Sequence, residues 1–247
     1  MASTIETGHA KNVANLDKLI QICTTFGTTY NPSKTTLTLA SLSTLSADAR
    51  IVLDKLIQKN TDFHTAENNR KIAFKGLKPL STRIVNALKV TDASDETIED
   101  AKGINRKIQG ASLSKTTNPD TIDPNNPNLA SKHISTSQQS YDNLIEHIAK
   151  LISLVISEPT YAPNDVGLTQ TDLNTYITQL KTLNINYMKA DAEAKDARLQ
   201  RNALLYSKNT GLYDIAQDTK NYVKSLYGAI SPQYKQVSKI QFTNKAK

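Results

Sequence analysis

Residues 34–75, KTTLTLASLSTLSADARIVLDKLIQKNTDFHTAENNRKIAFK, contain neither glycine nor proline, the two residues that most readily interrupt a helix. Apolar residues recur here at an alternating spacing of three and four, which is typical of helices that pack along their length at a shallow angle. This seam, with Lys59 as its clear break, comprises Leu42, Leu45, Ala49, Val52, Leu56, Phe63, Ala66, Arg70, Ala73, Leu77, Leu80 and Ile84. The stretch predicts one helix of about 40 residues, roughly 60 Å long.

A second stretch without glycine or proline, residues 168–210, follows the same plan. Tyr30-Asn31-Pro32 and Tyr161-Ala162-Pro163 lie 131 residues apart and precede the two stretches. At that offset the matching pairs are Leu37 and Leu168, Thr38 and Thr169, Leu42 and Leu173, Ala66 and Ala197, Arg70 and Arg201, Ile84 and Ile215, and Lys89 and Lys220. Upstream, Asn15-Leu16 matches Asn143-Leu144 at an offset of 128. We therefore predict an internal duplication.

The predicted fold is all-α, a long-helix module present twice with helical-bundle or coiled-coil-like packing. Copy 1 spans residues 12–110 and copy 2 spans residues 140–242, the latter including a basic aromatic tail. Residues 111–139 are rich in Pro, Asn, Ser and Thr, and we predict a linker or crossover there. The other helices are predicted at residues 12–28, 80–89 and 93–108 in copy 1 and at residues 141–157 and 212–227 in copy 2.

Composition favours helices with wide solvated faces over a loop-rich enzyme, since only 38% of residues are hydrophobic and glycine and proline number 8 each. The net charge of +7 is spread along the chain, which indicates a mildly basic surface. Cys23 is the only cysteine and lies among apolar residues, so we expect a buried thiol. We find neither a secretory signal nor a membrane span, and expect a cytoplasmic protein.

Arg70 and Arg201 are the most informative polar residues, because the seam places a cation where a hydrophobic residue is expected. One interpretation is an anion or ligand site between long helices. The other, which we favour, is a structural arginine whose stem packs along the seam while its head pairs with a carboxylate. Carboxylates are available nearby in both copies: Asp62, Glu67, Asp191, Glu193 and Asp196.

The C-terminal segment interleaves aromatic residues with lysines. Its candidate interaction residues are Tyr227, Tyr234, Lys235, Lys239 and Phe242, to which the turn tyrosines Tyr30 and Tyr161 are added. Aromatic residues among cations can stack bases and contact phosphates. The favoured alternative is that the tail docks its aromatic side chains on the bundle or a neighbouring subunit, and residues 237–242 could also form a short strand.

No motif in the sequence indicates catalysis, a metal or a cofactor. The four histidines share no ligand spacing, and neither a phosphate-binding loop nor a nucleophile elbow is present. We therefore expect a protein that is not an enzyme and binds no cofactor. Its predicted role is a structural or scaffolding protein that self-associates or binds a protein partner through its long helices. The alternative is binding of nucleic acid or an anionic surface by the tail.

With its duplicated Tyr-x-Pro helix module and its closing GAISPQYKQVSKIQF, residues 228–242, the chain resembles a group of bacterial all-helical proteins that have no assigned function. The resemblance implies a duplicated helical fold and transfers no active-site residue.

Overall fold

The computed structural model describes residues 4–110 and 139–244, and within these ranges every regular element is helical. The prediction of an all-α fold is therefore confirmed. Two 3-10 turns, Gly27–Thr29 and Thr35–Leu37, lie between the first two helices. The α-helices are α1 (Thr4–Thr24), α2 (Leu39–Lys75), α3 (Leu77–Lys89), α4 (Asp95–Gln109), α5 (Tyr141–Ser157), α6 (Gln170–Tyr206), α7 (Leu212–Tyr227) and α8 (Pro232–Ser238).

The helix boundaries follow local signals in the sequence. Ser94, Ser140 and Ser231 cap α4, α5 and α8, each accepting a hydrogen bond from a backbone N–H of the first turn. Gly110 ends α4 in the left-handed conformation, at φ +73°, where a glycine carries little strain. The predicted linker falls almost wholly on residues 111–138, which lie outside the described residues.

The chain divides into two compact units. Unit 1 comprises Met1–His64 and Lys189–Lys247, and unit 2 comprises Thr65–Met188. The long helices α2 and α6 each contribute one part to either unit, so the units cut across the predicted copies at residues 12–110 and 140–242. Each unit is described on its own below.

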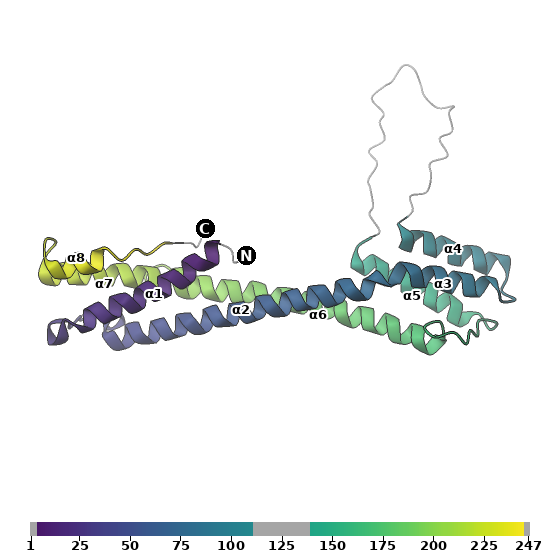
Figure 1. Cartoon of the computed structure of the whole chain (residues 1–247), viewed down its shortest axis with the longest axis horizontal. Coiled ribbons are helices and arrows are strands. Elements are labelled where there is room, and N and C mark those ends of the chain that lie inside the picture. The colour runs from purple at the N-terminus through teal and green to yellow at the C-terminus, as the bar shows by residue number, and fades with distance from the viewer. Residues whose placement is uncertain (1–3, 111–138, 245–247) are drawn as a thin grey trace, which may run out of the picture. The chain divides into compact units, whose positions relative to one another are not determined.

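Unit 1 packs α1, α7 and α8 around the N-terminal part of α2 and the C-terminal part of α6 (Figure 1). In this unit α1 and the residues after α8 run close to each other (Figure 1). The fully buried side chains of its core include Leu16, Leu19, Cys23, Leu42, Leu205, Leu212, Ala216, Val223 and Val237.

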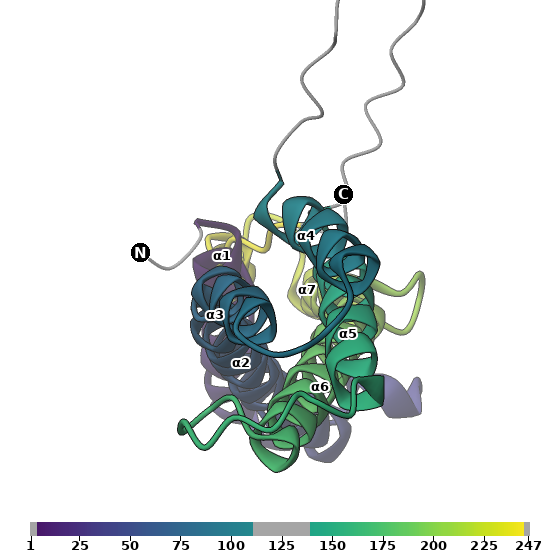
Figure 2. The ribbon, with the colours of Figure 1, turned by 90° about the vertical axis from the view of Figure 1, so that its right-hand side faces the viewer.

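Unit 2 packs α3, α4 and α5 around the C-terminal part of α2 and the N-terminal part of α6. Figure 2 views this unit from its end, with α4 lying over α3 and α5. Its core is separate from that of unit 1, and the fully buried members include Ile84, Leu88, Ala101, Ile108, Ile148, Leu151, Val155, Leu173 and Leu180.

Within each unit the segments of α2 and α6 run antiparallel. In unit 1, Lys55 Nζ donates to Gln200 Oε1 at 2.8 Å, and Lys59 Nζ donates to Glu193 Oε2 at 2.7 Å. A later residue of α2 thus meets an earlier residue of α6. The contact between Lys59 and Glu193 also explains the break in the apolar seam, because an ion pair between the helices occupies that position.

Every seam residue predicted from the sequence is buried or partly buried. Leu42, Ala49, Leu56, Leu77 and Ile84 are at most 1% exposed. The remaining members, such as Val52 and Phe63, are intermediate. The spacing of three and four therefore identified the inward face of α2 and of the first two turns of α3.

Candidate functional site

The two turn tyrosines close equivalent loops before the long helices. The Tyr30 hydroxyl donates to the Leu37 carbonyl at 2.8 Å, and the Tyr161 hydroxyl donates to the Leu168 carbonyl at 3.2 Å. Both rings are buried, and burial raises the pKa of each phenol, that of Tyr161 to about 12. Each tyrosine therefore serves as a neutral hydrogen-bond donor that holds a loop in place.

The Tyr30 ring also makes an edge-on contact with the ring of Tyr222 on α7, with centroids 5.3 Å apart. The Tyr222 hydroxyl accepts a hydrogen bond from the Asn31 backbone N–H at 3.2 Å. This loop of unit 1 is thus fastened to α7 by both a ring contact and a hydrogen bond.

Arg70 lies in unit 2 between two aromatic rings. Its guanidinium carbon is 3.3 Å from the centroid of the Tyr187 ring and 4.0 Å from that of Tyr141. Its Nη1 donates to Asn184 Oδ1 at 3.0 Å, and Asn184 Nδ2 donates in turn to Asp142 Oδ1 at 2.7 Å. The cation is thus stabilised by two ring faces and an amide, with a carboxylate one step further away.

We expected the head of Arg70 to contact a carboxylate such as Asp62 or Glu67. Those carboxylates instead make ion pairs with Lys59 and Lys71 along α2, at 3.5 and 2.8 Å. The Arg70 Nε is buried and has no hydrogen-bond partner among the described residues. The Arg70 guanidinium therefore contacts two aromatic rings and an amide, where we expected an ion pair with a carboxylate.

Arg201 occupies the corresponding position in unit 1 and is 7% exposed. Its Nε and Nη2 both donate to Asn202 Oδ1, at 3.1 and 2.9 Å. The nearby Asp196 accepts from Gln200 and Asp191 accepts from Lys195. The described contacts of Arg70 thus include two aromatic rings, and those of Arg201 include the amide of the neighbouring Asn202.

The C-terminal segment is packed into the core of unit 1. Val237 is fully buried, Ile240 is 5% exposed and Phe242 is 8% exposed. Lys220 Nζ donates to the Ile240 carbonyl at 2.5 Å and lies 5.3 Å from the centroid of the Phe242 ring. Burial lowers the pKa of Lys220.

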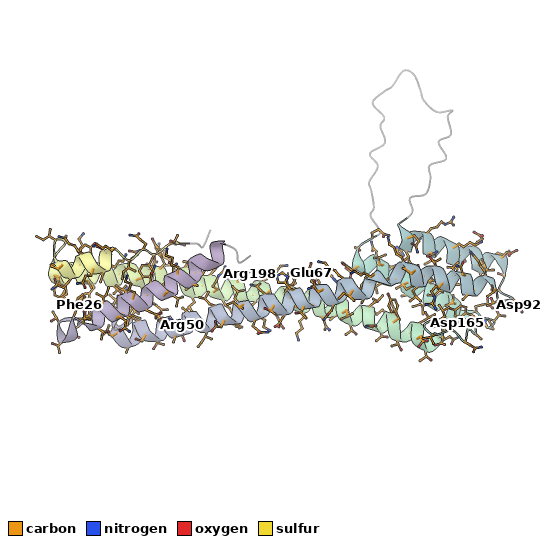
Figure 3. All side chains as sticks on the ribbon, in the orientation of Figure 1. Phe26, Arg50, Glu67, Asp92, Asp165 and Arg198 are labelled. Carbon is orange, nitrogen blue, oxygen red and sulfur yellow. The ribbon has the colours of Figure 1, made fainter. Side chains whose placement is uncertain are left out.

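The rest of the predicted tail residues divide into packed rings and exposed lysines. The Tyr227 ring contacts the ring of Phe26 edge-on, with centroids 5.2 Å apart, and Tyr234 is partly buried near Lys224. Figure 3 labels Phe26 in unit 1. Lys235 and Lys239 are exposed. This arrangement matches docking of the tail on its own bundle.

Residues 237–242 do not form the strand that we considered. Helix α8 continues to Ser238, and the residues after it are extended without strand pairing. Side chains of α1 take up the backbone groups that a strand partner would have bonded. Asn12 exchanges two hydrogen bonds with the backbone of Thr243, at 2.7 and 3.0 Å, and Asn15 Nδ2 donates to the Gln241 carbonyl at 2.6 Å.

Several buried polar residues were missed by the sequence reasoning. The His9 Nδ1 lies 2.6 Å from the Tyr206 hydroxyl, which also accepts from Asn12 Nδ2 at 3.3 Å. Asn12 stands four residues before Leu16 on the apolar face of α1, so a polar residue on an apolar face was the available signal. His147 is 7% exposed on α5, and its Nε2 has no partner among the described residues.

Asp92 and Asp165, labelled in Figure 3, belong to the loops of unit 2 and line one shallow hollow with Thr91 and Pro163. Among the described residues no cluster of three or more His, Cys, Asp or Glu side chains is arranged to hold a metal ion. In the same residues no helix has the length and apolar character needed to cross a bilayer.

Comparison of the chain with known protein families, with functionally characterised proteins and with solved structures finds no match. The resemblance to bacterial all-helical proteins therefore stays a prediction.

Proposed function

We propose that this protein is a non-enzymatic structural or scaffolding protein that self-associates through its long helices. A cytoplasmic location stays part of this proposal. The proposal of self-association rests on the location of the exposed apolar side chains. Six of the ten large apolar side chains that are exposed in the described residues belong to α2 and α6: Ile51, Ile57, Ile72, Ile185, Met188 and Leu199.

These side chains are well exposed on the surface of the long helices. Ile185 and Met188 in unit 2 are 58% and 50% exposed and stand three residues apart, so they are neighbours on one face of α6. In unit 1, Ile51 and Ile57 on α2 are each 64% exposed. Single exposed apolar residues are common, but adjacent ones on a long helix favour a protein interface.

We also propose that the chain arose by duplication of one helical module. The equal lengths of α2 and α6, 37 residues each, support this, as do the two tyrosine-closed loops. In unit 1 α1 packs on α7, and in unit 2 α5 packs on α3, which is the same pairing under the duplication. Under this proposal, each unit contains the first helix of one copy, α1 or α5, and the third helix of the other copy, α7 or α3.

Binding of nucleic acid by the tail, the alternative drawn from the sequence, gains no support from the packing. Base stacking needs an accessible ring, and Phe242 is 8% exposed while Tyr227 and Tyr234 pack against unit 1. The tail lysines Lys235 and Lys239 are exposed, but without an accessible ring beside them they offer charge alone, and we therefore favour self-association.

Light scattering across a wide range of protein concentration tests the proposal. We expect an assembly larger than the monomer whose dissociation constant rises by about tenfold or more in Ile185→Lys/Met188→Lys, because apolar burial is replaced by two charges. Val166→Lys is the matched control, since Val166 is 89% exposed but lies outside the long helices. A wild-type protein that is monomeric at every concentration would overturn the proposal.

A further inference from the structure

Acidic residues are unevenly distributed in unit 1. No Asp or Glu occurs between Asp17 and Asp48, and none occurs in residues 219–244. These two stretches include the end of α1, the loop that follows it, the C-terminal half of α7, and α8. Figure 1 shows these segments together at one end of unit 1. We call the surface formed by residues 24–38 and 222–239 the basic end.

Three exposed lysines of the basic end make no ion pair with a described carboxylate. Lys224 lies in the last turn of α7, Lys235 lies on α8, and Lys239 is the residue that ends α8. Lys224 Nζ is 5.8 Å from the centroid of the Tyr234 ring, which places it beside α8. The remaining lysine of the basic end, Lys34, is paired with a carboxylate of α7 at 2.6 Å. The basic end therefore keeps a net positive charge.

Two large apolar side chains are exposed at the turn between α7 and α8, within the basic end. Ile230 is 86% exposed and Leu226 is 37% exposed. The turn is packed on the loop after α1, because the ring of Tyr227 contacts the ring of Phe26. Contact of Ile230 and Leu226 with an apolar phase would remove their surface from water.

In unit 2, equally exposed aliphatic side chains lie among negative charges instead. Val90 and Val166 are 85% and 89% exposed, and they are close in sequence to Asp92 and Asp165. Val90 lines the same shallow hollow as these two carboxylates. An anionic partner is repelled there and attracted to the basic end. A single exposed aliphatic residue is common, and it is the combination with unpaired lysines that indicates the chemistry of a partner.

We propose that the basic end of unit 1 docks on the surface of an anionic lipid bilayer. The lysines contact the anionic headgroups, while Ile230 and Leu226 enter the boundary between headgroups and acyl chains. A nucleic acid also offers phosphates, but it has no apolar layer for these two aliphatic side chains. The docking goes beyond the proposed self-association and does not rest on it, because it leaves the outer faces of α2 and α6 available.

Co-sedimentation of the full chain with lipid vesicles tests the charge requirement. At low salt we expect binding to phosphatidylcholine vesicles that contain about 30% phosphatidylserine, and no binding to phosphatidylcholine alone. Lys235→Gln/Lys239→Gln should lower the partition coefficient about 20-fold, because each lysine near an anionic surface contributes about fivefold. Lys75→Gln/Lys181→Gln is the matched control, since it removes the same charge from exposed positions in unit 2, and it should bind like the wild type.

A polarity-sensitive dye attached to Ile230→Cys tests the insertion of the turn. The native Cys23 is fully buried and burial raises the pKa of its thiol to about 12, so it does not react with the dye. We expect the emission to move to shorter wavelength when anionic vesicles are added. Val166→Cys, labelled in the same way, is the matched control and should not respond. Ile230→Ser should also lower the partition coefficient about fivefold, and Val166→Ser should not.

No binding to the anionic vesicles, equal losses in the two lysine pairs, or an unchanged emission at residue 230 overturns the docking. Binding of duplex DNA in place of vesicles would assign the basic end to nucleic acid and overturns it as well. Light scattering of Lys235→Gln/Lys239→Gln without lipid separates the two proposals. Unchanged self-association with weakened vesicle binding supports the docking, and lost self-association overturns it while the proposed function stands. A monomeric wild-type protein that binds vesicles overturns the proposed function alone.

Discussion

Units 1 and 2 both pack shorter helices against an antiparallel pair of long-helix segments, but they differ in what covers the remaining side. In unit 2 the cover is α4, a full helix that packs on both α3 and α5. In unit 1 it is the short helix α8 followed by an extended segment whose backbone is bonded by side chains such as Asn12. Unit 2 is thus closed by a full helix, and unit 1 by a short helix and an extended segment that side chains of α1 hold by its backbone.

The largest loss of stability is expected from substitutions that create cavities in the two separate cores. Leu16→Ala in unit 1 and Leu151→Ala in unit 2 should each lower the free energy of unfolding by about 3 kcal/mol, because both side chains are fully buried. Hydrogen exchange measured by mass spectrometry should rise first in the substituted unit. An equal rise in both units from either substitution would show that the cores are not energetically separate.

A smaller effect, confined to unit 1, is expected from the polar contacts that hold the C-terminal segment. Asn12→Ala removes both hydrogen bonds to the Thr243 backbone at a side chain that is 1% exposed, and should cost about 2 kcal/mol. Asn15→Ala is the matched control, since its single bond to Gln241 is solvent-exposed and should cost about 0.5 kcal/mol. Denaturant unfolding measures both, and equal losses would contradict this account.

The sequence predicted the regular part of the fold well. Uninterrupted runs and apolar spacing located the long helices within a few residues, and α5 begins at Tyr141 and ends at Ser157 as expected. The first helix was misplaced, because Thr4–Thr24 begins before the apolar face that we used to find it. Helix α8 was missed because a seven-residue helix offers too few turns to show a period.

The surroundings of the candidate residues were harder to predict. The seam singled out Arg70, but Tyr141 and Tyr187 reach it from other helices, and spacing along one helix carries no information about them. The pairing of residues 4–110 with residues 139–244 within each unit was likewise invisible, because a repeated sequence pattern is the same whether each stretch folds on itself or pairs with the other. Only contacts between distant residues, such as Lys34 with Asp218, reveal it.

The seam arginine of unit 2 should contribute modestly to stability. Arg70→Met removes stacking on Tyr141 and Tyr187 but keeps an apolar stem in the seam, so we expect the fold to persist with a loss of about 1 kcal/mol. Lys71→Met is the matched control on the exposed side of the same helix, where little change is expected. The near-ultraviolet circular dichroism of the tyrosines should change only in Arg70→Met, and an unchanged spectrum with unchanged stability would refute the stacking role.

The smallest expected effect is a dependence of the stability of unit 2 on pH, through His147. Under the proposed duplication His147 on α5 corresponds to Leu19 on α1, so unit 2 carries a titratable ring where unit 1 has a buried leucine. Burial, reinforced by the charge of Lys107, lowers the pKa of His147 below its ordinary value of 6.5, while Glu146 opposes the shift. The folded state thus favours the neutral ring more than the unfolded state does.

The contribution of His147 to stability is therefore complete above pH 6.5 and is lost as the pH falls below 6.5 and through the lowered pKa of the folded state. His147→Leu should raise the free energy of unfolding and reduce its decline between about pH 7.5 and pH 5.5, because leucine fills the site without an unbonded ring nitrogen. Denaturant midpoints at the two pH values, for wild type and variant, measure this difference. Identical declines would mean that the stability of unit 2 does not respond to His147.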